Sequence, residues 1–319
     1  MNQILTVTLN PTVDLATSAE RILPGRKLRC GRPATDPGGG GINVSRAIAI
    51  LGGDSTAFIA VGGATGERLV QMLTVEGIGL SIFPGPGETR QSFSVTDRTT
   101  GDQYRFVLPG PEWTEPRVTL ALDEIGKVVA RSSYVVLSGS LPPGVPLEFP
   151  YRLAEVVARK GGRFVLDTSG TALRRVAELA DPARGPVAHV LRMDHLEAEE
   201  LAGAPLSSRK DSADFAQELV RRGLARIVIL ARGADGSTLV TAEERLHAEA
   251  AEVPVASGVG AGDSFVGAFT LSLSRAEPLA TALSKGSAAA SAAMMTEATK
   301  LCTRADAERL FSACPTISL

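Results

Sequence analysis

The tetrad Gly260-Ala261-Gly262-Asp263 is the segment whose residue types and spacing indicate chemistry most directly. An apolar run over 264–269 follows it, so the pattern predicts a tight backbone turn that leads into a buried helix. Such a turn directs free N–H groups and the positive end of the helix toward one point, where an anion can bind. A carboxylate beside that point suits a general base in phosphoryl transfer, because it would otherwise repel the anion. The alternative is an ordinary acidic residue near a helix N-terminus.

A second glycine-rich segment, 38–41, precedes Asn43 and a helical pattern over 44–51. Four consecutive glycines lose much conformational entropy on folding, which is tolerable where a backbone must approach a ligand closely. The side-chain amide of Asn43 is placed where it could hydrogen-bond a bound polyol. A flexible loop without a ligand is the alternative interpretation.

Four charged residues lie near a predicted small β-sheet that would cover the site: Asp14, Lys27, Arg29 and Arg90. An arginine fork binds phosphate with two hydrogen bonds, and an aspartate accepts hydrogen bonds from sugar hydroxyls. Each of the four alone would be an ordinary solvated charge. Their joint position on one side of the proposed site favours a sugar phosphate as ligand.

Short apolar segments alternate with helical patterns along the chain, and this alternation predicts the elements that position these groups. It is typical of a mostly parallel sheet covered by helices on both faces, with ligands bound at the carboxyl ends of the strands. We expect strands at 4–9, 55–61, 134–137, 164–166, 188–191 and 227–230.

One region breaks the alternation. The segments 91–95 and 103–108 predict an antiparallel hairpin around the polar turn 99–102. A further strand-like segment at 27–32 would complete a small β-sheet that stands off the main body. Because so small a sheet is marginally stable alone, we expect it to cover a site, to pair with another subunit, or both.

Composition excludes several classes of protein. The chain has 319 residues, 44% hydrophobic and 21% charged, with a formal net charge of −2, so neither nucleic acid nor a membrane is an expected partner. Cys30, Cys302 and Cys314 are widely spaced, which favours reduced thiols in a cytoplasmic protein. The patterns GxxxxGK[ST], GxGxxG and GxSxG do not occur, which disfavours P-loop, dinucleotide and α/β-hydrolase sites.

Five segments together resemble the PfkB group of the ribokinase-like carbohydrate kinases, in the right order and over nearly the whole chain: 10–14, 38–46, 89–91, 138–144 and 259–264. The resemblance implies an α/β, ribokinase-like fold with a mostly parallel central sheet flanked by helices. It implies a single kinase domain over 1–319 with a small β-sheet lid formed by about 12–35 and 88–109. It also implies a homodimer that forms through this lid.

The resemblance further implies ATP with Mg²⁺ as phosphoryl donor, Asp263 as the base, and Gly260, Ala261 and Gly262 as the anion hole. Lys27 and Arg29 would reach the sugar phosphate from a neighbouring subunit. The residues implied for the sugar phosphate are Asp14, Lys27, Arg29, Gly38, Gly39, Asn43, Arg90 and Ser140. Those implied for the nucleotide are Arg192, Asp194, Arg232, Gly233, Gly236 and Gly258, with Asp194 and Glu197 orienting magnesium-bound waters.

Within the group, the segments 25–30, 64–67 and 103–106 look most like the minor-type bacterial 6-phosphofructokinases. That likeness implies transfer of the ATP γ-phosphate to the C1 hydroxyl of fructose 6-phosphate, which gives fructose 1,6-bisphosphate. A tagatose-6-phosphate kinase or a 1-phosphofructokinase is the alternative. Those kinases usually carry Lys in the glycine loop, where this chain has Gly40.

The departures from the family pattern lie on the nucleotide side. The usual Lys-Pro-Asn-x-x-Glu is replaced at 192–197 by Arg-Met-Asp-His-Leu-Glu, and Ala231 and Gly258 each replace a residue with a hydroxyl. A second class therefore stays open, a regulatory protein that binds a sugar phosphate and has a degraded nucleotide site. The presence of Asp263 favours the enzyme, because a binding protein needs no general base.

Overall fold

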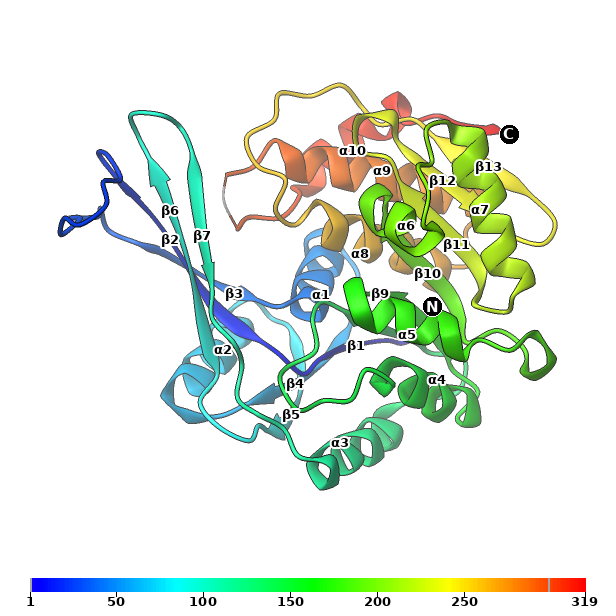
Figure 1. Cartoon of the computed structure of the whole chain (residues 1–319), viewed down its shortest axis with the longest axis horizontal. Coiled ribbons are helices and arrows are strands. Elements are labelled where there is room, and N and C mark those ends of the chain that lie inside the picture. Colours follow the sequence, from blue (N-terminus) through cyan, green and yellow to red (C-terminus); the bar gives the residue numbers. More distant parts are fainter. Residues whose placement is uncertain (1, 298) are drawn as a thin grey trace.

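The computed structural model describes residues 2–297 and 299–319 (Figure 1). Its main sheet has ten strands in the order β14-β13-β12-β11-β10-β9-β8-β1-β4-β5. The strands from β5 to β11 pair in parallel, and β12, β13 and β14 add an antiparallel edge. Their bounds are β1 Ile4–Thr8, β4 Thr56–Val61, β5 Gly79–Pro84, β8 Tyr134–Ser138, β9 Arg163–Asp167, β10 Ala188–Asp194, β11 Ala225–Ala231, β12 Ser237–Val240, β13 Arg245–Ala248 and β14 Thr316–Ser318.

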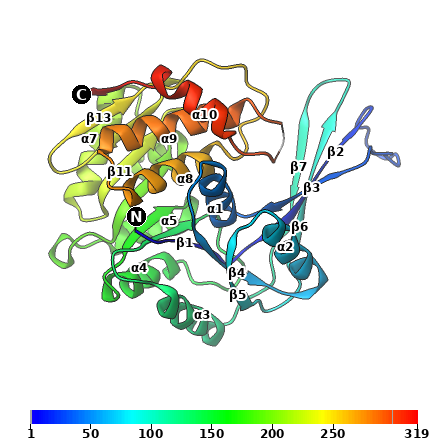
Figure 2. The ribbon, with the colours of Figure 1, turned by 180° about the vertical axis from the view of Figure 1, so that it is seen from behind.

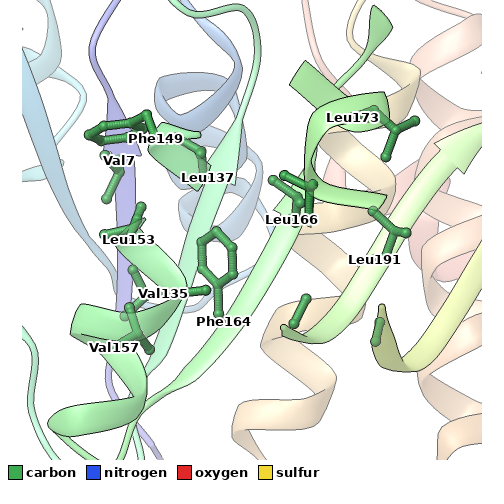
Figure 3. Close-up of a cluster of buried hydrophobic side chains, with 14 of the residues drawn as sticks. Val7, Val135, Leu137, Phe149, Leu153, Val157, Phe164, Leu166, Leu173 and Leu191 are labelled. Carbon is green, nitrogen blue, oxygen red and sulfur yellow. The ribbon is translucent and has the colours of Figure 1, made fainter. Parts of the chain in front are cut away.

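Helices cover both faces of this sheet, so the predicted α/β architecture is confirmed (Figures 1 and 2). One face packs against α3 to α7, and Figure 3 shows Leu153 and Val157 of α4 directed toward Val135 and Phe164 of the sheet. The other face packs against α1, α8 and α9. The helices are α1 Gly40–Ile50, α2 Gly63–Val75, α3 Glu115–Val128, α4 Phe149–Arg159, α5 Gly170–Leu179, α6 His195–Ala202, α7 Arg209–Arg221, α8 Ala261–Ser274, α9 Leu279–Met294 and α10 Arg304–Leu310.

Helix α8 is buried along most of its length because it lies between α1, the sheet and α9. This confirms the buried helix predicted after the Gly260 turn. Gly267 permits the close approach to α1, since a Cβ at that position would lie 2.9 Å from the Cβ of Ala47. The tight packing fixes the position of the amino end of α8.

A second sheet of four strands, in the order β3-β2-β6-β7, projects from the main body (Figure 1). The antiparallel hairpin of β6 and β7 confirms the prediction for this region. The strand predicted at 27–32 is wrong: residues 21–33 form an exposed irregular loop, and the strand follows at 34–38. The sheet strands are β2 Thr12–Ala19, β3 Ala34–Gly38, β6 Arg90–Asp97 and β7 Gln103–Val107.

Interactions outside the sheet explain why β3 forms where its sequence, Thr-Asp-Pro-Gly, looks like a turn. Arg46 of α1 donates a hydrogen bond to the carbonyl of Pro37 at 3.0 Å. Thr299 donates another to the carboxylate of Asp36 at 2.5 Å. These contacts hold the segment against β2, and tertiary contacts thus override local preference.

All three cysteines are free thiols, as expected from their spacing. None of the helices in the described part of the chain combines the length and the hydropathy that a bilayer span requires.

Candidate active site

The turn before α8 has the conformation that an anion site requires. Gly260 adopts a left-handed conformation with φ of 79°, and the helix begins at Ala261. A Cβ on Gly260 would lie 2.7 Å from Leu301, so conformation and space both demand glycine there. The first N–H groups of a helix have no partner within it, and they point out of this end together with the positive end of the dipole.

Asp263 is in the first turn of α8, next to these N–H groups. It accepts hydrogen bonds from the Asn43 amide at 3.0 Å and from the Ser138 hydroxyl at 3.1 Å. The same hydroxyl lies 2.9 Å from the carboxylate of Asp167. Burial, and next the negative charge of Asp167, raise the pKa of Asp263 to about 6. The group is therefore ionised at neutral pH and is a stronger base than an ordinary aspartate.

This pKa gives a prediction for the pH profile. A base acts only when it is deprotonated, so kcat/KM should fall about tenfold per pH unit below a pKa near 6. Initial rates at substrate concentrations well below KM, measured over a series of pH values, report this decrease. If kcat/KM instead stays constant down to the ordinary pKa of an aspartate, Asp263 is not the base of the reaction.

A cavity of about 350 Å³ lies between the amino end of α8 and the inner face of the small sheet. Asp14, Gly39, Asn43, Arg90 and Asp263 line it together. Gly38 packs directly against the Asp14 carboxylate, where no Cβ would fit. The cavity thus collects hydroxyl-binding groups and a cation beside the proposed base.

Backbone carbonyls hold Arg90 in place. Its Nε and Nη2 donate to the carbonyl of Asn10 at 3.4 and 3.2 Å, and Nη1 donates to that of Leu108 at 3.1 Å. Among the described residues, no carboxylate oxygen lies within 4.0 Å of the Arg90 guanidinium, so Arg90 forms no ion pair. Its charge is therefore available to an anion in the cavity.

Other predicted sugar-side residues lie elsewhere. Lys27 and Arg29 are exposed in the loop 21–33 and do not line this cavity. Ser140 is exposed next to Asn10, whose amide donates a hydrogen bond to its hydroxyl at 3.3 Å. Gly258, predicted for the nucleotide, lines the sugar-side cavity instead.

A second cavity, of about 610 Å³, lies on the other side of the same turn. Ala261 and Gly262 line it with Arg192, whose Nη1 is 3.2 Å from the carboxylate of Asp167. Any Cβ on Gly262 would lie 3.1 Å from that nitrogen, so the guanidinium sits against the turn. The wall of the second cavity is largely apolar and includes Val253, Val255, Phe265, Ala290 and Met294. Asp194, Gly233 and Gly236 also line it.

The side chain of Arg232, predicted for the nucleotide, is held away from the second cavity. The guanidinium donates to Asp235, to Ser212 and to the carbonyls of Leu206 and Ser207, and it does not line the second cavity. Arg232 therefore ties its loop to the segment before α7 and to α7 itself. The backbone of that loop reaches the cavity through Gly233 and Gly236.

Asp194 and Glu197 form a capping box at the start of α6. Each carboxylate accepts a hydrogen bond from the backbone N–H of the other residue, at 2.9 and 2.8 Å. In the described part of the chain, the second oxygen of each carboxylate accepts no hydrogen bond from protein. The predicted pair is thus partly structural and keeps one free oxygen on each side chain.

Three residues of the site received no role from the sequence. Arg105 lines the first cavity and pairs with Ser94 of β6, on the same face of the small sheet as Asp14. The alternation of side chains between the two faces of the predicted hairpin was the signal that could have identified Arg105. Ser138 and Asp167 end β8 and β9, at the sheet edge where ligands were expected, and that position was the signal for both.

Comparisons with known proteins agree with this geometry. The family model described as pfkB family carbohydrate kinase matches residues 7–306. The ATP-dependent 6-phosphofructokinase isozyme 2 of Mycobacterium tuberculosis is 38% identical over 309 residues, 97% of this chain and 89% of that protein. The protein of the same name from Escherichia coli is 38% identical over 98% of this chain and 99% of its own.

More distant relatives carry another name. The 1-phosphofructokinase of Bacillus subtilis is 31% identical, with 92% of this chain and 93% of the relative covered. Among solved structures, phosphofructokinase-2 from Escherichia coli in complex with fructose-6-phosphate superposes with a TM-score of 0.89 at 36% identity. That match covers 98% of this chain and 99% of the other.

Proposed function

The chain belongs to the PfkB family of carbohydrate kinases, and from this premise we propose that it transfers the γ-phosphate of ATP to the C1 hydroxyl of fructose 6-phosphate. One observation carries the proposal: the turn at the start of α8 touches both cavities. Asp263 and Gly260 line the first cavity, while Ala261 and Gly262 line the second. A phosphoryl group that passes from one cavity to the other must cross this turn.

In the proposed reaction, the Asp263 carboxylate takes the proton of the acceptor hydroxyl. The hydroxyl oxygen forms a bond to the γ-phosphorus as the bond from that phosphorus to the β-phosphate oxygen breaks. The free N–H groups of the turn and Arg192 stabilise the charge on the transferred group. Asn43 and Asp14 bind sugar hydroxyls, and Arg90 and Arg105 bind the sugar's own phosphate.

The glycine loop favours fructose 6-phosphate over the alternatives. A Cβ at Gly40 would lie 2.7 Å from the backbone nitrogen of Gly139 and closer still to the Ser138 hydroxyl. The Lys that tagatose-6-phosphate and 1-phosphofructokinases usually carry there does not fit this backbone. The altered nucleotide side still offers a cation and an apolar cavity for ATP.

A coupled phosphorylation screen tests the proposal. It pairs fructose 6-phosphate, tagatose 6-phosphate and fructose 1-phosphate with ATP and other nucleotides at several magnesium concentrations. We expect the highest kcat/KM for fructose 6-phosphate with ATP. A higher value for fructose 1-phosphate would make the chain a 1-phosphofructokinase, and no product with any pair would favour the regulatory binding protein.

We propose Mg²⁺ as the second cofactor. Arg192 is the cation among three carboxylates, those of Asp167, Asp194 and Glu197. Burial, together with the negative charges of Asp194 and Asp167, raises the pKa of Glu197. The free carboxylate oxygens of Asp194 and Glu197 suit a hard divalent ion or its waters. When bound, the ion would neutralise charge on the phosphate oxygens.

Glu197→Gln is expected to raise the magnesium concentration for half-maximal activity by about tenfold, because it removes one negative charge from this set. Gln can still accept the capping hydrogen bond, so the Tm should stay close to that of the wild type. Magnesium titrations of the rate measure the effect. Glu200→Gln on the same helix is the matched control, and equal behaviour of both variants would remove Glu197 from the metal site.

We propose further that the chain forms a homodimer through the outer face of the small sheet. Phe93 lies opposite Phe106, and Val95 lies opposite Tyr104, so these four side chains share one face. Phe106 is 52% exposed and Tyr104 is 42% exposed. Contiguous exposed apolar side chains mark interaction surfaces, and a second copy offers the same face. In this dimer Lys27 and Arg29 would reach the partner's sugar site.

Phe106→Glu is expected to shift the protein from dimer to monomer, since it places a charge in the apolar contact. Sedimentation velocity over a range of concentrations measures the mass. Gln103→Glu adds the same charge on the same strand with its side chain on the opposite face, and it should stay dimeric. A monomeric wild type, or a dimeric Phe106→Glu variant, would contradict the proposed interface.

A further inference from the structure

A cavity of about 570 Å³ lies at the end of the main sheet opposite to the active site, where β9, β10 and β11 begin. Arg163, Arg184, His189 and Arg226 line it, together with the backbone of Gly162. The active-site residues Ser138, Asp167 and Asp194 are at the carboxyl ends of their strands, whereas this cavity is at the amino ends. Nothing in the proposed reaction uses it.

The positive charge of this cavity is only partly compensated. Three arginines and a histidine line it, and no aspartate or glutamate does. Arg184 is 3.6 Å from Asp181, while Arg163 and Arg226 have no carboxylate within 4.0 Å in the described part of the chain. The cavity is therefore a concave region of positive potential, which attracts anions.

A helix end accounts for Arg184, the last residue of the short 3₁₀ helix Pro182–Arg184, but not for Arg163 and Arg226. Arg159 and Lys160, at the end of α4, are placed where cations offset a helix dipole. Arg163 is instead the first residue of β9, and Arg226 is the second residue of β11. The last carbonyls of α4, which would repel an anion, already accept hydrogen bonds from the N–H groups of 160–162.

Arg163 is held in position by Tyr134. Its Nη1 donates to the Tyr134 hydroxyl at 3.0 Å, and its Cζ lies 5.2 Å from the ring centroid. His189 packs edge-on against the Tyr134 ring, with the centroids of the two rings 5.9 Å apart. Burial, and next the charges of Arg163 and Arg226, lower the pKa of His189 to about 4, so the imidazole is neutral at neutral pH.

We propose that this cavity binds a small multivalent anion that carries phosphate groups, through the guanidinium groups of Arg163, Arg184 and Arg226. Guanidinium forks match the geometry of phosphate oxygens and bind them with paired hydrogen bonds. The cavity has the volume of a metabolite site rather than that of a single monatomic ion. Such a ligand would reach the enzyme without competing for the active site.

The three histidines of the chain allow a direct test with inorganic pyrophosphate. His189 reports on the cavity, and His195 reports on the nucleotide side, because it follows Asp194 at the start of α6. We expect the imidazole NMR signal of His189 to shift and saturate with a Kd below about 1 mM at near-physiological ionic strength. Pyrophosphate on the nucleotide side would shift His195 independently.

Arg226→Ala should weaken the His189 titration by about tenfold, because it removes one charge-assisted contact. Arg226 is exposed, and Arg184 is exposed at the end of the short 3₁₀ helix Pro182–Arg184, so Arg184→Ala provides a second variant that leaves the core intact. Arg304→Ala on α10 is the control with the same charge change. An unmoved His189 signal, or an identical titration in the Arg226→Ala and Arg304→Ala variants, would overturn the proposal.

Discussion

Asp263→Asn is expected to lower kcat by about 10²- to 10⁴-fold while the sugar phosphate still binds. The amide cannot take the proton of the acceptor hydroxyl, but it keeps the shape of the carboxylate. It can still accept from Asn43, and its NH₂ group can donate to Ser138. Single-turnover rates and sugar-phosphate affinity, measured on the same preparation, separate chemistry from binding.

Stability provides the control for this variant. Burial beside Asp167 raises the pKa of Asp263, so the ionised carboxylate destabilises the folded state at every pH above about 6. That cost disappears as the pH falls and the folded protein takes up a proton. Asp263→Asn should thus be at least as stable as the wild type at neutral pH. Asp123 is exposed on α3, so Asp123→Asn is the control that should leave the rate unchanged. A wild-type rate in Asp263→Asn would remove its assigned role.

Arg90→Ala is expected to raise the KM for the sugar phosphate by roughly 10- to 100-fold, the effect of losing a charged hydrogen-bonding group. The KM for ATP should change by no more than about twofold, because Arg90 lines the first cavity and not the second. Steady-state kinetics with each substrate varied in turn measures both constants.

Arg98→Ala is the matched control for Arg90. It lies just beyond the same strand, it is 61% exposed and it pairs with Glu20 away from the cavity. We expect its kinetic constants to match those of the wild type. Equal losses for both substrates in Arg90→Ala would place this residue outside the sugar-phosphate site.

The main sheet was largely predictable because its central strands are short apolar runs buried on both faces. The segments at 134–137 and 227–230, for example, agree with β8 and β11. The short antiparallel edge of β12, β13 and β14 was missed, since its strands have three or four residues and little periodicity. Strand β3 was misplaced because Arg46 and Thr299, far apart in the sequence, hold it in the sheet.

The candidate site shows a similar division. Groups that follow directly from a strand or a helix start, such as Asp14 and Asp263, line the cavity as their positions suggested. The orientation of the Arg232 side chain could not be predicted, because a charged side chain beside a glycine turn can face either way. Here Asp235 and Ser212 bind it on the side away from the cavity lining. Only the packed structure decides such an orientation.

The most direct test of the central claim is a crystal structure with fructose 6-phosphate and a non-hydrolysable ATP analogue. The account predicts the C1 hydroxyl within about 2.6–3.2 Å of the Asp263 carboxylate. The γ-phosphate should lie against the backbone N–H groups of Ala261 and Gly262, between the two cavities. A sugar bound with its C1 hydroxyl remote from Asp263, or a triphosphate that does not reach this turn, would contradict it.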